Sequence, residues 1–170
     1  MDEFDRYFPR FVGIVLDICN LGRLQDISNQ IIRIIPKIER DDCFHIAGTG
    51  ELKRYRGEMI AAAAVYRRPY DFNVGKAMQN VMELFSQQDS DAKKTVLVFT
   101  DCYTTAFQHN VKICLTINDK RGFENRFCIC GIGGGYDKSL EKLCEGQVEF
   151  IHLNDCSNFS QIVMERYNDK

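Results

Sequence analysis

Residues Phe11–Leu21 read FVGIVLDICNL and carry the strongest structural signal in this sequence. The apolar run Phe11–Leu16 has no polar alternation, which is typical of a strand buried on both faces of a parallel sheet. Asp17 ends this run. A helix is expected next, over Leu21–Ile38, because leucine and isoleucine recur there at helical spacing. A buried strand that ends in an acid and leads into a helix indicates an α/β fold.

The rest of the chain continues this alternation. The patterns predict strands over Cys43–Ala47, Lys94–Phe99, Arg126–Ile132 and Val148–Leu153, and helices over Val74–Phe85, Gln108–Asn118, Asp137–Leu143 and Asn158–Arg166. The alanines of Glu58–Tyr66 favour a helix, whereas its position favours a strand. Such an order predicts a mostly parallel sheet that is covered on both faces. Ligands of such sheets bind at the carboxyl ends of the strands, where Asp17 and Asp101 are expected.

Length and composition fit one domain over residues 1–170, with 45% hydrophobic and 27% charged residues. The net charge of -2 is spread along the chain without a basic block, so nucleic acid is not an expected partner. The longest apolar runs are too short to cross a bilayer. Met1–Arg10 is acidic and aromatic, unlike a secretory signal.

The chain contains eight cysteines, and most lie in apolar segments that resemble core elements. Cys128 and Cys130 share one face of an expected strand, a separation that does not suit a disulfide. No Cys-x2-Cys pair suggests zinc. We therefore expect free, buried thiols and an intracellular location, cytoplasmic or nuclear. The cysteines behind this expectation are Cys19, Cys114, Cys128, Cys130 and Cys144.

Five segments, in order, resemble the von Willebrand factor A (vWA) family. They are FVGIVLDICNL from Phe11, DFNVGKAMQNVMELF from Asp71, KTVLVFTDC from Lys94, FCICGIGGGYDKSLEKLC from Phe127 and HLNDCSNFSQIV from His152. The resemblance implies a Rossmann-like three-layer α/β/α sandwich with one antiparallel edge strand, which would be Glu58–Tyr66. It extends over nearly the whole chain.

Many vWA domains hold Mg²⁺ between two serines, a threonine and acids at the top of the sheet, and a partner's carboxylate completes the coordination. Here Cys19, Leu21 and Phe72 stand at the three hydroxyl positions, and none of them suits Mg²⁺, which prefers hard oxygen ligands. Asp17 and Asp101 remain at the acid positions. The resemblance therefore implies a degenerate metal site, with no metal or other cofactor expected. A divalent-metal-dependent domain that uses Asp17 and Asp101 is left open as an alternative.

The function expected from this resemblance is non-catalytic protein–protein interaction, as a scaffold in a multi-protein assembly. The expected contact surface is the top of the sheet, where apolar residues would anchor a partner. Its residues would be Asp17, Cys19, Asn20, Leu21, Phe72, Asp101, Cys102 and Thr104. An open edge at Glu58–Tyr66 would also permit a homo-oligomer. The basic stretch Glu51–Gly57, with Arg67 and Arg68, is expected to form a solvated hairpin that protects the edge, and an interaction surface for acidic partners is left open as the alternative.

A small α/β enzyme or nucleotide-binding protein is a second alternative. It would use either the glycine turn Gly131–Gly135 or the thiol of Cys102. The turn matches neither the dinucleotide-binding fingerprint nor the P-loop, because the required glycine positions hold other residues. The anion of Asp101 would disfavour a thiolate at the adjacent Cys102. We therefore do not expect catalysis.

Overall fold

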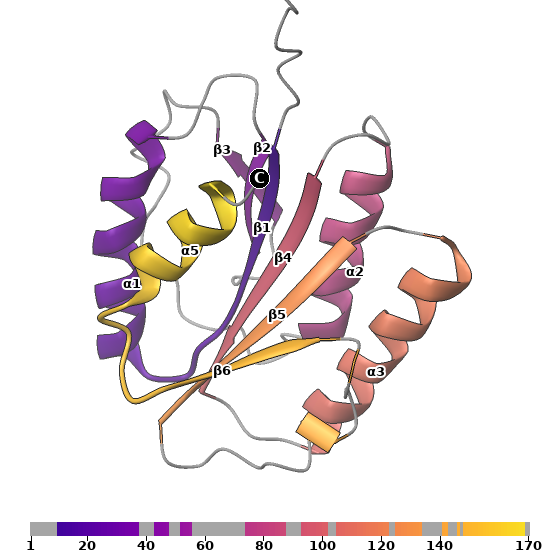
Figure 1. Cartoon of the computed structure of the whole chain (residues 1–170). Helices are drawn as coiled ribbons and strands as arrows, with labels where there is room; N and C mark the ends of the chain where they lie inside the picture. Colours follow the sequence, from indigo (N-terminus) through magenta and orange to yellow (C-terminus); the bar gives the residue numbers. More distant parts are fainter. Residues whose placement is uncertain are drawn as a thin grey trace, which may run out of the picture.

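The computed structural model describes residues 10–37, 43–47, 52–55, 74–87, 93–101, 105–122, 125–133, 141–142, 146 and 148–168 (Figure 1). Within these ranges, the side chains of residues 35, 43–47, 52–55, 93 and 105–108 are not described. The described elements alternate between strands and helices along the chain.

A twisted six-stranded sheet forms the centre of the fold, with strand order β3-β2-β1-β4-β5-β6. The neighbouring strands from β2 to β6 pair in parallel, whereas β3 runs antiparallel to β2 at one edge. The strands are β1 (Arg10–Asp17), β2 (Cys43–Ala47), β3 (Leu52–Tyr55), β4 (Lys93–Thr100), β5 (Asn125–Ile132) and β6 (Glu149–Leu153). The chain order reverses between β1 and β4, so these two strands flank the switch point at which ligands of α/β sheets bind.

Helices cover both faces of this sheet (Figure 1). On one face lie α1 (Leu21–Ile34), which continues into the short 3₁₀ helix η1 (Ile35–Lys37), and α5 (Phe159–Asn168); on the other lie α2 (Val74–Ser86) and α3 (Thr105–Lys120). Successive residues of β1 point to opposite faces: Val12 and Ile14 pack under α1 and α5, whereas Phe11 and Val15 pack under α2 and α3. Burial on both faces explains the continuous apolar run of this strand.

Most of the expected elements are confirmed within a few residues. The main shortening is at α1, which ends at Ile34 rather than at residue 38, because Pro36 lacks the amide hydrogen that an α-helix requires. The stripe of Leu24, Ile27, Ile31 and Ile34 is buried, as its spacing predicted. The α/β fold class is therefore confirmed.

Two expectations at the sheet edge have different outcomes. The charged stretch around Leu52–Tyr55 contains β3, which the sequence analysis did not identify as a strand. Residues 58–66 lie outside the described residues, so the edge strand expected there stays a prediction. No helix in the described part of the chain is long and apolar enough to cross a membrane.

Candidate functional site

The carboxyl ends of β1 and β4 lie side by side, because Asp17 pairs with Thr100 in the parallel register. The amide of Asp101 donates to the carbonyl oxygen of Asp17 at 3.2 Å, which extends the pairing by one residue. The loop from Cys19 to the first turn of α1 runs directly beside this point. We call this part of the molecule the carboxyl-end face and define it by Cys19, Asn20, Leu21, Arg23 and Asp101.

Asp17 lies beneath this face rather than on it. Its side chain is buried, and Oδ2 accepts a hydrogen bond from the hydroxyl Oγ1 of Thr100 at 2.9 Å. A buried carboxylate is stable only when donors compensate for its lost hydration, and Thr100 provides one of them. Asp17 therefore supports the strand ends from inside, which corrects the expectation that it forms part of the contact surface.

The side chain of Asp101 is only 2% exposed, and its carboxylate forms the centre of the carboxyl-end face. Its Oδ1 accepts a hydrogen bond from the amide of Cys19 at 2.6 Å, and Oδ2 accepts one from the amide of Asn20 at 3.3 Å. Both carboxylate oxygens are thus bonded to the loop that enters α1. Hydrogen bonds from backbone amides to a carboxylate are charge-assisted and stronger than neutral ones. They fix the position of the loop on the end of β4.

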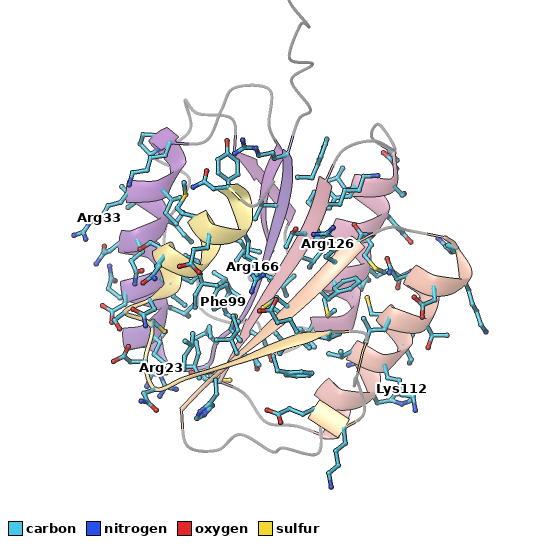
Figure 2. The ribbon with its side chains drawn as sticks, in the orientation of Figure 1. Arg23, Arg33, Phe99, Lys112, Arg126 and Arg166 are labelled. Atoms are coloured by element: carbon cyan, nitrogen blue, oxygen red, sulfur yellow. The ribbon has the colours of Figure 1, made fainter. Side chains whose placement is uncertain are left out.

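Arg23 also belongs to this site, although the sequence analysis did not identify it. Its guanidinium Nη1 lies 3.0 Å from Oδ2 of Asp101 and forms an ion pair with it. Figure 2 shows Arg23 at the lower left, near the end of the sheet where β1, β5 and β6 converge. An arginine in the first turn of a helix is usually interpreted as solvated, so the sequence alone gave no signal for a partner 78 residues away.

The neighbouring residues shape the entrance to α1. Asn20 is its N-cap, since its side-chain Oδ1 accepts from the amide of Arg23 at 3.0 Å and its carbonyl accepts from the amide of Leu24 at 3.1 Å. Leu21 is 50% exposed, the most exposed large hydrophobic side chain in the described part of the chain. The structure therefore brings together an exposed apolar side chain, a capped helix start and an internally bonded carboxylate.

Cys19 is exposed and forms a disulfide. Its partner lies outside the described side chains. This corrects the expectation of a free, buried thiol at Cys19, which rested on an apolar neighbourhood; the residue stands instead in the loop after β1. The remaining expected contact residues, Phe72, Cys102 and Thr104, lie outside the described residues.

The cysteines of the core agree better with the sequence analysis. Cys114, Cys128, Cys130 and Cys156 are free and buried. The sulfur atoms of Cys128 and Cys130 lie 4.0 Å apart without a disulfide bond, as their spacing predicted. Burial raises the pKa of Cys114 to about 12. Burial is also the main reason that the pKa of Cys156 is raised to about 11.

The start of the glycine turn lies beside the carboxyl-end face. Gly133 has a φ of 92°, and its amide donates to the carbonyl of Leu153 at 2.9 Å. Nε2 of His152 lies 3.0 Å from the carbonyl oxygen of Gly133, to which it donates as the Nε2-protonated tautomer. These bonds tie the ends of β5 and β6 together. The turn beyond Gly133 lies outside the described residues, so the nucleotide alternative is not tested there.

Across the described residues, no three His, Cys, Asp or Glu side chains gather closely enough to hold a metal ion. The two acids of the expected site have different environments, since Asp17 accepts from a hydroxyl and Asp101 from amides and a guanidinium.

Comparison with known proteins identifies the fold. No family model matches the sequence, and no curated protein is significantly similar to it. Among solved structures, a von Willebrand factor type A protein from Catenulispora acidiphila superposes with a TM-score of 0.64 at 16% identity, over 92% of this chain and 42% of that one. The pilus adhesin SpaC from Lactobacillus rhamnosus GG, in its open conformation, superposes with a TM-score of 0.67 at 9% identity, over 97% of this chain and 30% of that one.

A second structure of the same adhesin gives a TM-score of 0.67 at 8% identity, over 97% of this chain and 31% of that one. At these identities the likeness shows the fold alone, and the fold is of the vWA type. The chain spans less than half the length of each of these proteins. Membership of the expected fold is thus confirmed from structure, although no sequence comparison finds it.

Proposed function

We propose that this chain is a non-catalytic protein-interaction module of the vWA type, which binds its partner through the carboxyl-end face without a metal ion. One observation carries the proposal: Leu21 is half exposed and directly follows Asn20, whose amide bonds the carboxylate of Asp101, and both oxygens of that carboxylate are already bonded within the chain. An exposed apolar side chain among polar groups that are fixed in place fits the apolar centre and polar rim of a protein interface. A pilus adhesin among the similar folds is in keeping with such a role.

The side chains of the carboxyl-end face support partner binding without a metal ion. A hard cation such as Mg²⁺ needs several oxygen ligands in near-octahedral order. Cys19 and Leu21, at two of the three positions where the resemblance implies hydroxyl ligands, supply no hard oxygen from their side chains, and the lone pairs of Asp101 point to amides and a guanidinium. These residues do not fit a hard metal ion, so no step of the proposed binding involves one.

The proposal is tested by affinity capture with two matched variants. Leu21→Asp places a charge on the proposed anchor, and Ile113→Asp does the same on α3, where Ile113 is 45% exposed. We expect Leu21→Asp to lose the captured partner, and Ile113→Asp and the wild type to keep it equally in EDTA and in Mn²⁺. Loss in EDTA would favour the metal-dependent alternative. Retention by Leu21→Asp would contradict the proposed surface.

The assembly, the cellular location and the oligomeric state of the module are also proposals. We place the module in a multi-protein assembly, inside the cell, with pairing of two copies as an additional mode. The four free, buried thiols among the described residues support a reducing compartment, and the disulfide at Cys19 weighs against it. An enzymatic role through the glycine turn or Cys102 would instead appear as stabilisation by a nucleotide or as selective alkylation of Cys102.

A further inference from the structure

The buried carboxylate of Asp101 requires a compensating positive charge. Its side chain is 2% exposed, so it has lost nearly all of its hydration. Backbone amides of Cys19 and Asn20 offset part of that loss, but they bring no net charge. A buried ion that is not paired with an opposite charge is strongly destabilising, so a cation close to Asp101 is a condition for this arrangement.

Arg23 supplies that cation from a fixed position. The N-cap bond from its amide to Asn20 anchors the residue in the first turn of α1, and its Nη1 reaches Oδ2 of Asp101 at 3.0 Å. The side chain of Arg23 is 33% exposed, whereas that of Asp101 is 2% exposed, so the arginine is the more accessible member of the pair. A divalent cation at this carboxylate would be repelled by the guanidinium charge that already lies 3.0 Å from Oδ2.

The end of β5 is shaped to accept this guanidinium. A Cβ atom on Gly133 would lie 3.0 Å from Nη2 of Arg23 and 3.5 Å from Nη1, so the absence of a side chain at this position leaves room for the group. Three separate segments therefore contribute to the seat: α1 provides the arginine, β4 leads to the acid, and β5 leads to the glycine. This ion pair therefore differs from an exposed surface pair, because one partner is buried and three chain segments surround it.

We infer that Arg23 is the resident cation of the carboxyl-end face: it neutralises Asp101 from within the chain and thereby keeps divalent metal ions away from that carboxylate. A metal bound here would place a positive charge opposite the acid at the end of β4. The guanidinium provides that charge instead. This inference concerns the charge balance of the chain itself and holds whether or not the face binds a protein.

The test compares the thermal melting of the wild type and of Arg23→Gln, Asp101→Asn and the double variant, each in EDTA and in Mn²⁺. Arg33→Gln serves as the matched control, because Arg33 is an exposed arginine of the same helix. In EDTA, we expect Arg23→Gln to melt about 4–10 °C below Arg33→Gln, since the buried carboxylate of Asp101 loses the guanidinium that faces it. We expect Arg23→Gln to lower the melting temperature much less when Asp101→Asn is already present.

Manganese provides the second measurement, because carboxylates suit this ion. At about 10 mM, Mn²⁺ should leave the wild type and Arg33→Gln unchanged and raise the melting temperature of Arg23→Gln by roughly 3 °C. The double variant should not respond. A wild type that responds to Mn²⁺ through Asp101, an Arg23→Gln that melts with Arg33→Gln, or an Arg23→Gln that ignores Mn²⁺ would each overturn the inference.

Arg23→Lys keeps the inference testable if Arg23→Gln does not fold. Lysine retains the charge but not the planar fork of the guanidinium, so we expect this variant to melt below the wild type and to remain insensitive to Mn²⁺. A Mn²⁺ response that Asp101→Asn removes from the lysine variant would contradict the role of the resident charge. No partner protein enters these measurements, so their failure is distinguishable from failure of the proposed binding function.

Discussion

The hydroxyl of Thr100 donates a 2.9 Å hydrogen bond to Oδ2 of Asp17, and both side chains are buried at the ends of adjacent strands. This bond joins β4 to β1 at the point where the sheet meets the carboxyl-end face. A threonine that ends an apolar strand is therefore part of the support of the site. Its hydroxyl offsets some of the cost of burying a carboxylate.

Replacement of Thr100 by valine removes this donor while keeping the shape of the side chain. We expect Thr100→Val to lower the free energy of unfolding by about 1–3 kcal/mol, because the buried carboxylate loses a hydrogen bond. Urea denaturation measures the change. Thr95→Val is the control, since Thr95 is also buried in β4 but lies near the start of the strand, away from Asp17. Equal stability of the two variants would show that the Thr100 hydroxyl is dispensable.

The seating of α2 on β1 depends on Gly13. A Cβ atom at this position would collide with Cγ1 of Val81 and lie 3.3 Å from Cζ of Phe85, so Val81 would have to shift and the fit against Phe85 would be tight. We expect Gly13→Ala to destabilise the protein by about 1–3 kcal/mol through overpacking. Thermal melting provides the measurement.

The matched test of that explanation is the double variant Gly13→Ala/Val81→Ala. If the Cβ atom collides with Val81, the double variant should be more stable than the sum of the two single changes predicts, by roughly 1 kcal/mol. Strict additivity would mean that the strain arises elsewhere.

The layered fold could be predicted from the sequence because burial of the sheet on both faces produces clear hydrophobic patterns. β1 and β4 appear as apolar runs, and α1 and α2 carry stripes at helical spacing, so local pattern and tertiary environment agree. β3 escaped prediction because its short sequence, LKRY, has a charged centre and little apolar alternation. Edge strands are stabilised by one neighbour and tolerate such residues.

The candidate site was predicted only in part, because its defining contacts are remote in sequence. The resemblance to vWA domains placed Asp101 and Asn20 on one face, and the parallel pairing of β1 with β4 brings them together there. No local pattern shows that Arg23 pairs with Asp101, or that the absence of a side chain at Gly133 makes room for the guanidinium. Those facts depend on where three chain segments meet.

Phe72 provides a further prediction about the contact surface. This residue lies outside the described residues, in the segment just before α2, and stands where the resemblance implies a metal-binding threonine. We expect Phe72→Ala to weaken partner capture at least tenfold without changing the melting temperature, because an aromatic anchor of an interface contributes about 2 kcal/mol or more. Unchanged capture by a folded variant would remove Phe72 from the proposed surface.

Cysteine reactivity offers a test of both the core and the disulfide. At about pH 8 the buried thiols of Cys114 and Cys156 should stay protonated and unreactive toward iodoacetamide, because the thiolate is the nucleophile. The pKa of Cys114 is raised to about 12 and that of Cys156 to about 11, so their thiolate fractions grow only as the pH rises toward those values. Unfolding restores ordinary pKa values, and both thiols should then be labelled within minutes.

Cys19 should behave differently, since it is disulfide-bonded rather than buried. Peptide mapping after unfolding without reductant should find Cys19 unlabelled and Cys114, Cys128, Cys130 and Cys156 labelled; a dithiol reductant should then expose Cys19 and its partner cysteine together. Because an exposed thiol at the end of β1 would react in the folded protein, labelling of native Cys19 without reductant would contradict the disulfide. That result would instead favour the reduced, intracellular state that the cysteine pattern of the sequence indicates.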